Sequence, residues 1–219
     1  MCSAECVIFG VKSLLNEVKG KRILEVGSED VNGSLRSCII ALKPKEYIGV
    51  DIWIGPGVDK VCKAEELIEK FGKNSFDIVI ATELLEHVMD WRSVISNIKN
   101  VCKPGGIILI TTRSYGFGYH AFPNDFWRYE ANDLRGIFSD CKIEALEEDK
   151  SAPGVFLKAK KQKKFIENDV SKYALYSIVK NKRIKELTRS DLNSPRFALI
   201  KFKVKVRTNL SKLFNRFFR

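Results

Sequence analysis

Short apolar runs alternate with amphipathic stretches along most of the chain. The runs are rich in branched residues and are bounded by Gly, Pro, Asn or Ser, which is typical of buried strands. Between them, apolar residues recur at three- and four-residue steps, which predicts helices with one buried face. The predicted strands cover residues 21–26, 46–51, 58–62, 76–81 and 107–112, and the predicted helices cover 4–18, 34–42, 64–71, 90–101 and 132–138, with a turn at 104–106.

Strands that alternate with helices predict a parallel sheet covered on both faces. Two more strands, 142–146 and 154–159, have only a turn at 151–154 between them, which suits an antiparallel hairpin at the sheet edge. The expected fold class is therefore α/β, a Rossmann-like seven-stranded doubly wound sheet whose last strand is antiparallel. We expect this domain to cover residues 1–160 and a basic C-terminal extension to cover residues 161–219.

Composition narrows the class of protein. Hydrophobic residues make up 45% of the 219-residue chain, an ordinary value for a soluble globular protein. Its apolar runs fall short of the roughly 18 to 20 residues of a membrane span, and Glu5 makes the N-terminus a poor secretory signal. The six cysteines are scattered without a CxxC pair, so we expect reduced thiols, no metal and a cytoplasmic location.

The charge is concentrated at the C-terminal end. Residues 158–219 carry 19 Lys and Arg against four acids, whereas the preceding part is mildly acidic. Strict alternation predicts a strand over 201–206, and three- and four-residue steps predict a helix over 210–218. Basic charge with aromatics suits an anionic membrane surface, which would place the protein at the inner face of the membrane. It also suits RNA, a less favoured partner, or an appendage docked on the core with its lysines in water.

The first predicted strand leads into a glycine turn that suits a nucleoside ligand. Glu25 ends the apolar run, Gly27 allows close approach of the backbone, and Asp51 at the next strand tip can accept both hydroxyls of a ribose. Glu29 stands where a dinucleotide fingerprint has its second glycine, which argues against a pyrophosphate packed on the backbone.

These segments, taken in order over residues 20–160, resemble the class I S-adenosylmethionine-dependent methyltransferases, in particular the group that includes sugar and polyketide methyltransferases. The resemblance rests on several short pieces, each weak alone. They are Glu25-Val26-Gly27-Ser28, Val50-Asp51, Ser75-Phe76-Asp77-Ile78-Val79, Glu83-Leu84-Leu85-Glu86-His87-Val88 and Val101-Cys102-Lys103-Pro104-Gly105-Gly106.

The resemblance implies S-adenosyl-L-methionine as the cofactor and assigns residues to its parts. Lys63 departs from the family, because an acid often stands there. The methionine part would lie over Glu25, Gly27 and Ser28, and the ribose and adenine would be held by Asp51 and Ile52. The adenine edge would be reached by Ala64 and Glu65. The transferred methyl would lie beside Thr82 and Glu83.

The acceptor side is expected in the long aromatic segment 113–129, which resembles family members associated with surface polysaccharides. We expect His87, His120 and Asp125 as catalytic residues and Tyr115, Trp127 and Arg128 as substrate contacts. Other interpretations stay open. The segment could be a lid packed by its own aromatics, with Arg128 paired to Asp125 or Glu130, and His87 could hold its loop rather than act as a base. Glu86 and Asp90 are expected to be solvated or capping residues.

The expected function is therefore methyl transfer from S-adenosylmethionine to a small-molecule or glycan acceptor, at a sugar hydroxyl in polysaccharide biosynthesis. The alternatives are a non-catalytic module that binds S-adenosylmethionine, and an RNA methyltransferase guided by the basic tail. The sequence after the fourth strand lacks an Asn-Pro-Pro-Tyr-like motif, so methylation of nucleic-acid base amines is unsupported. The sequence leaves the oligomeric state open.

Overall fold

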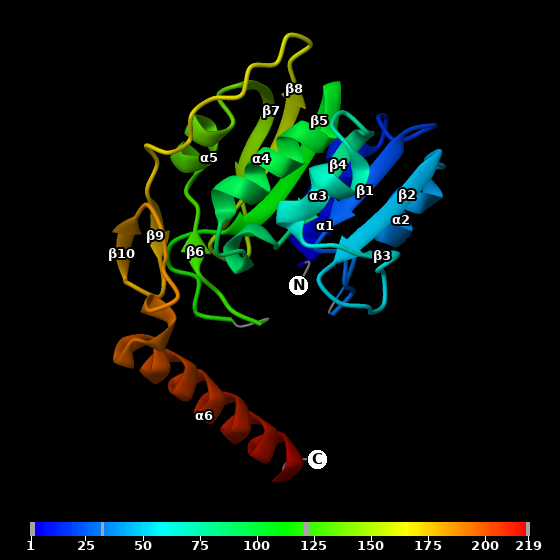
Figure 1. The fold of residues 1–219 in the computed structure, drawn as a ribbon. Coiled ribbons are helices and arrows are strands. Elements are labelled where there is room, and N and C mark those ends of the chain that lie inside the picture. The colour runs from blue at the N-terminus through cyan, green and yellow to red at the C-terminus, as the bar shows by residue number, and fades with distance from the viewer. Residues whose placement is uncertain (1–2, 32, 121–122, 218–219) are drawn as a thin grey trace.

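A seven-stranded sheet forms the centre of the molecule (Figure 1). The computed structural model describes residues 3–31, 33–120 and 123–217. The strand order is β3-β2-β1-β4-β5-β8-β7, in which β1 to β5 run parallel and β8 runs antiparallel to both of its neighbours. The expected α/β fold with an antiparallel last strand is confirmed. Its strands are β1 (Arg22–Val26), β2 (Glu46–Asp51), β3 (Lys60–Val61), β4 (Phe76–Thr82), β5 (Cys102–Arg113), β7 (Cys141–Glu148) and β8 (Gly154–Lys161).

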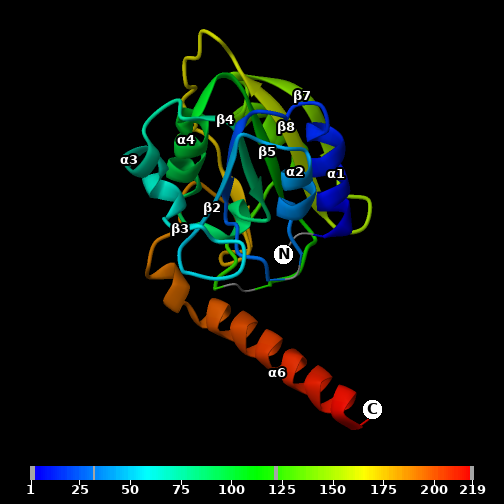
Figure 2. The ribbon, with the colours of Figure 1, turned by 90° about the vertical axis from the view of Figure 1, so that its right-hand side faces the viewer.

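Successive side chains of the central strands point to opposite faces of the sheet and build two apolar layers. In β4, Ile78 and Ile80 pack under α1 and α2, whereas Val79 and Ala81 join the layer under α3, α4 and α5. Figure 2 shows α1 and α2 on one side of the sheet and α3 and α4 on the other. The helices are α1 (Ala4–Leu14), α2 (Arg36–Ala41), α3 (Leu67–Phe71), α4 (Trp91–Val101) and α5 (Ala131–Ile137).

Most local differences from the predicted elements lie at their ends. The helix predicted over 64–71 divides into a 3₁₀ turn, η1 (Ala64–Glu66), and α3. Asp90 caps α4, since its side chain accepts from the Ser93 backbone N–H. The turn predicted at 104–106 lies inside β5, where the pairing with β4 shifts between Phe76 and Ile78. Gly105, at φ +79°, allows this bulge without ending the strand.

The first part of the C-terminal extension packs on the sheet domain. Strand β9 (Leu175–Ser177) pairs with β10 (Lys182–Ile184) and with β6 (Trp127–Arg128), which gives a second sheet of three strands. Leu175, Val179 and Phe197 are buried in the same apolar layer as α4 and α5. Residues up to the beginning of the last helix therefore share a core with the preceding domain.

The last helix, α6 (Pro195–Phe217), follows the 3₁₀ turn η3 (Asp191–Asn193) and extends away from the body in both views (Figures 1 and 2). The strand predicted over 201–206 is wrong. An isolated strand cannot satisfy its backbone N–H and C=O groups without a partner edge, whereas a helix satisfies them within the segment. Among the described residues, we find no helix that combines the length and the apolar character needed to span a bilayer.

Candidate active site

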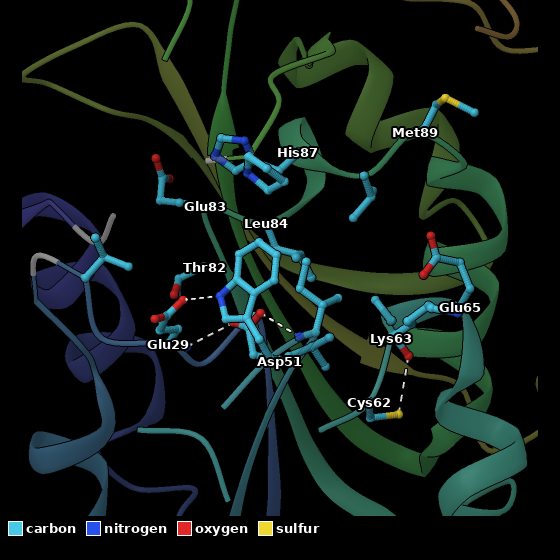
Figure 3. A pocket seen from close by; sticks show the side chains of 18 of the residues that line it. Glu29, Asp51, Cys62, Lys63, Glu65, Thr82, Glu83, Leu84, His87 and Met89 are labelled. Carbon is cyan, nitrogen blue, oxygen red and sulfur yellow. Dashed lines mark hydrogen bonds between the residues drawn. The ribbon is translucent and has the colours of Figure 1, made fainter. Parts of the chain in front are cut away.

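A cavity of about 370 Å³ opens at the edge where the parallel strands β1, β2 and β4 end. Ligands of open α/β sheets bind outside this carboxyl edge. Figure 3 shows side chains from these strand ends and from the loops that follow them around the cavity. Nine of the predicted site residues line it: Gly27, Asp51, Ile52, Ala64, Glu65, Thr82, Glu83, His87 and His120.

Gly27 brings the backbone of the first turn to the cavity wall. Its φ is +75°, in the left-handed region that favours glycine, and its N–H donates to the Val50 carbonyl at 2.9 Å. A Cβ at this position would lie 2.9 Å from Cδ1 of Leu84, which also lines the cavity. The backbone conformation therefore favours glycine here, and a Cβ would also displace the Leu84 side chain.

Gly27→Ala is expected to lower stability more than Gly20→Ala. Gly20 has nearly the same φ, +73°, but a Cβ there would meet no atom within 4 Å. Both variants carry the left-handed strain of about 1–2 kcal/mol, and only Gly27→Ala also displaces Leu84. Chemical unfolding of the two variants measures the difference, and equal losses would contradict the close contact with Leu84.

Asp51 lies at the tip of β2 and faces the cavity beside Glu29 (Figure 3). Its Oδ2 accepts from the Glu29 N–H at 3.1 Å and its Oδ1 accepts from the Ile52 N–H at 2.7 Å. Each carboxylate oxygen has a second lone pair, so the group can still accept two hydroxyls. The Glu29 side chain accepts from the Trp53 indole at 2.7 Å, a contact that sequence reasoning missed.

The chemistry of the residues around the cavity is compatible with S-adenosylmethionine. Asp51 offers acceptors for a ribose diol, Ile52 and Ala64 offer apolar surface for an adenine, and Gly27 offers close backbone approach for the methionine part. Lys63, which replaces the acid expected from the family, pairs with Glu66 at 2.8 Å, while Glu65 lines the cavity.

Glu25 and Ser28, both expected at the cofactor, do not line the cavity. The Glu25 carboxyl is 98% buried among residues of the α2 side, and burial raises its pKa to about 7 against the opposing effects of Tyr47 and Arg36. The Ser28 hydroxyl lies 2.6 Å from the position of a Cβ on Gly49. Successive side chains of β1 point to opposite faces of the sheet, and Glu25 lies on the face that α2 covers, next to Tyr47 and Arg36.

Glu83 borders the cavity, but its carboxylate is held by an ion pair with Arg113. Arg113 also pairs with Asp149 at 3.1 Å, which connects the end of β4 to β5 and the β7–β8 hairpin. Glu83 has a φ of +53°, and its N–H donates to the Thr111 carbonyl at 2.8 Å. Burial raises the pKa of Glu83, and the neighbouring Glu86 adds to the effect. Glu83 thus fixes the backbone beside Thr82.

His120 and Pro123 bring the described part of the aromatic segment after β5 to the cavity wall, and a buried ion pair holds this part in place. Arg128 binds Asp125 in a bidentate manner, at 2.5 and 2.6 Å, and both side chains are fully buried. Arg128 also donates to the carbonyls of Phe117 and Gly118. The pairing of Arg128 with Asp125, one of the two partners considered from the sequence, is therefore present.

The three expected substrate contacts lie outside the cavity lining. Trp127 is buried and its indole donates to the Val88 carbonyl at 3.0 Å. Arg128 is engaged by Asp125. Tyr115 is 63% exposed and packs edge-on against Tyr176, with ring centroids 4.7 Å apart. Hydrogen bonds therefore occupy the polar groups of Trp127 and Arg128, whereas Tyr115 packs on Tyr176.

Glu86 lies between the two histidines and is fully buried, so the expectation that it is solvated or capping is wrong. Its Oε1 lies 3.7 Å from His120 Nε2 and 4.0 Å from His87 Nε2. The Thr112 hydroxyl donates to the other oxygen, Oε2, at 2.8 Å.

The capping role expected for Asp90 is confirmed by its bond to Ser93.

The charges in this cluster stabilise one another. Burial opposes ionisation of Glu86, yet His120 and His87 hold its pKa at about 2. Burial also opposes the charge on His120, but Asp125, 3.0 Å from its Nδ1, and Glu86 raise its pKa to about 9. His87 Nδ1 lies 2.6 Å from the Asn124 carbonyl. A carbonyl only accepts, so Nδ1 carries the proton and the Nε2 of a neutral His87 presents its lone pair.

The sheet order, the glycine turn and the acid at the tip of β2 define a class I S-adenosylmethionine-dependent methyltransferase, and S-adenosylmethionine is the cofactor of this class. A family model described as a methyltransferase domain matches residues 10–148, and the chain belongs to this family.

Curated relatives match over shorter stretches. The chain is 31% identical over 106 residues to a ubiquinone biosynthesis O-methyltransferase of Idiomarina loihiensis, which covers 42% of each chain. It is 37% identical over 67 residues to phosphoethanolamine N-methyltransferase 2 of Caenorhabditis elegans, 31% of this chain and 15% of that protein. The chain thus spans less than half the length of these relatives.

Solved structures share the fold at low sequence identity. An S-adenosylmethionine-dependent methyltransferase from Mesorhizobium loti has a TM-score of 0.57 at 16% identity, with 73% of this chain and 98% of that chain covered. A Burkholderia thailandensis 1,6-didemethyltoxoflavin-N1-methyltransferase, solved with S-adenosylhomocysteine, has a TM-score of 0.57 at 12% identity over 73% of this chain and 76% of that chain.

Proposed function

We propose that the protein transfers a methyl group from S-adenosylmethionine to a hydroxyl of a small-molecule or glycan acceptor. The observation that carries this proposal is that His87 and His120 border the same cavity as Gly27 and Asp51. A side chain able to take a proton therefore lies next to the site suited to the cofactor. The partial likeness to O-methyltransferases of ubiquinone biosynthesis supports an oxygen acceptor.

The bound cofactor supplies an activated methyl group, so the chain contributes mainly alignment. Asp51 and Gly27 would orient the ribose and methionine parts. The Arg128–Asp125 pair holds in place the segment that carries His120 and Pro123 at the cavity wall. The lone pair on His87 Nε2 would accept the proton of the acceptor hydroxyl as the new C–O bond forms.

The proposed acceptor is a sugar hydroxyl of a polysaccharide precursor, and polysaccharide biosynthesis is the proposed process. A transfer assay with labelled S-adenosylmethionine tests this assignment of the acceptor. The acceptors offered are sugar nucleotides and lipid-linked sugars, with catechols as the comparison. Transfer to the sugars supports the proposal, and transfer to catechols alone overturns the glycan assignment. Cofactor binding without transfer to either class would support the rival function, a non-catalytic binding module.

Helix α6 has two apolar faces, and one of them stays exposed. Phe197 packs edge-on against Tyr119 and Ile200 contacts the core, which docks the beginning of the helix. On the opposite face, Leu199, Phe202 and Val206 are 52%, 64% and 39% exposed. Leu210, Leu213 and Phe217 continue this three- and four-residue spacing in the sequence.

Basic residues flank the exposed apolar face, which we propose binds an anionic membrane surface from the cytoplasmic side. Lys203 and Arg207 fall on one flank by helical spacing and Lys205 and Lys212 on the other. Lysine stems can cover apolar surface while their charged ends reach lipid phosphates. An acceptor carried on a lipid would then lie close to the cavity.

Deletion of residues 202–219 is expected to abolish flotation with liposomes that contain anionic lipid. The deletion begins after Ile200 because Phe197 and Ile200 pack on the body, so the fold should be kept. Phe202→Glu should reduce flotation at full length, and Lys163→Glu, on an exposed loop, is the matched surface control. If wild type floats no more than the deletion variant does, α6 does not bind the membrane. Salt-sensitive binding of RNA by α6 instead would favour the RNA alternative.

A further inference from the structure

Both histidines of the chain converge on one buried carboxylate at the wall of the cavity. His87 and His120 are the only histidines in the sequence, and their ring centroids lie 4.8 Å apart. Together with Glu86 they offer three ligand atoms that all lie within 4.8 Å of one another. Two imidazole nitrogens and a carboxylate oxygen form a ligand set typical of open, catalytic metal sites.

A polar group from outside the cluster lies beside each of these side chains, as an ion-pair partner of His120 and as a hydrogen-bond partner of His87 and Glu86. Asp125 lies 3.0 Å from Nδ1 of His120, and the Asn124 carbonyl lies 2.6 Å from Nδ1 of His87, so each ring turns Nε2 toward Glu86. Thr112 occupies Oε2 of Glu86. The other oxygen, Oε1, is buried and accepts no hydrogen bond from the described residues. Partners of this kind fix ligand tautomers and orientations in metal sites.

We propose that His87 Nε2, His120 Nε2 and Glu86 Oε1 bind a divalent transition-metal ion of the Zn²⁺ type. Ligand atoms about 2.1 Å from one tetrahedral ion lie about 3.4 Å from each other, so the two distances to Oε1, 3.7 and 4.0 Å, would shorten when the ion binds. Two imidazoles favour Zn²⁺, Co²⁺ or Fe²⁺ over Mg²⁺, which prefers oxygen ligands in octahedral geometry. The remaining coordination positions would face the cavity that His87 and His120 line.

The use of this ion in methyl transfer rests on the proposed function, whereas its binding does not. An acceptor hydroxyl that ligated the ion would have a lower pKa and would lose its proton more readily before attacking the methyl group. With the ion bound, Nε2 of His87 is a ligand and no longer a base, so the released proton would pass to solvent; no electrons are exchanged. The ion would also place the acceptor oxygen beside the end of β4, where Thr82 borders the cavity.

Titration of the full-length protein with Co²⁺, after dialysis against a chelator, tests the site by visible d–d absorption. We expect one ion per chain, displacement by Zn²⁺, and no displacement by Mg²⁺. His120→Gln and Glu86→Gln should each weaken Co²⁺ binding by about 100-fold. Thr112→Val, which removes only the bond to Oε2, should weaken it by about 10-fold. Glu69→Gln, on the exposed side of α3, is the matched control and should bind as wild type does.

Several outcomes would overturn the proposal. The first is that the protein gives no Co²⁺ spectrum and binds no Zn²⁺ by calorimetry. The second is that His120→Gln binds Co²⁺ as tightly as wild type does. The third is that the spectrum shows thiolate charge-transfer bands that disappear in Cys62→Ser. Thermal unfolding of each variant checks the fold, and Thr112→Val keeps the test valid if Glu86→Gln does not fold. Calorimetry with S-adenosylhomocysteine on the same samples separates the two proposals. Loss of cofactor binding would count against the proposed function, while the Co²⁺ result stands by itself.

Discussion

Asp51→Ala is expected to weaken the binding of S-adenosylhomocysteine by about 100-fold, measured by calorimetry. The Asp51 carboxylate already accepts from the N–H groups of Glu29 and Ile52 and faces the cavity with its remaining lone pairs. A hydrogen bond to a charged group contributes about 1.5–3 kcal/mol. Loss of two such bonds to a ribose therefore corresponds to about 3 kcal/mol, which is about 100-fold in affinity.

Two variants control this experiment. Asp51→Asn keeps one acceptor oxygen and should give an intermediate affinity, whereas Asp169→Ala, an exposed aspartate of the extension, should bind as wild type does. Thermal unfolding shows whether the turn at Gly27 survives the change. Unaltered affinity in a folded Asp51→Ala protein would remove Asp51 from the cofactor site.

Arg128→Met is expected to lower the free energy of unfolding by about 3–5 kcal/mol, because it leaves the buried Asp125 carboxylate without its partner. The Arg128 guanidinium makes two bonds to Asp125 and donates to two lid carbonyls. Asp125 also orients His120, so the lid and the cluster at the cavity wall should loosen together. Denaturant unfolding measures the loss.

A surface ion pair gives the matched comparison. Arg22→Met breaks the half-exposed pair with Glu46 and one hydrogen bond to the Ser75 carbonyl, and should cost about 1–2 kcal/mol, less than Arg128→Met. The double variant Arg128→Met/Asp125→Leu removes both buried charges and should recover part of the loss, since no unpaired carboxylate remains. Equal effects of Arg22→Met and Arg128→Met would show that the lid pair is not the dominant support of the lid.

The sequence determined the class of fold through features that act locally. Strand and helix periods, the glycine at 27 and the acids at strand tips depend on neighbouring residues, and the structure places Gly27, Asp51 and Thr82 around one cavity as expected. The segment 201–206 shows the limit of such patterns. Its alternation fits a strand, but the backbone hydrogen bonds it would need have no partner edge, and it is part of α6.

Only the tertiary structure decided which polar groups face the cavity. The sequence suggested Tyr115, Trp127 and Arg128 as acceptor contacts, yet hydrogen bonds to other residues occupy Trp127 and Arg128, and Tyr115 packs against Tyr176. From the sequence, Glu86 was expected to be a solvated or capping residue, but it is fully buried. Glu86 lies between His87 and His120 because β4, β5 and the lid bring residues more than 30 positions apart together. Periodicity reports which side of an element is buried, whereas the neighbour across that side depends on the packing of distant segments.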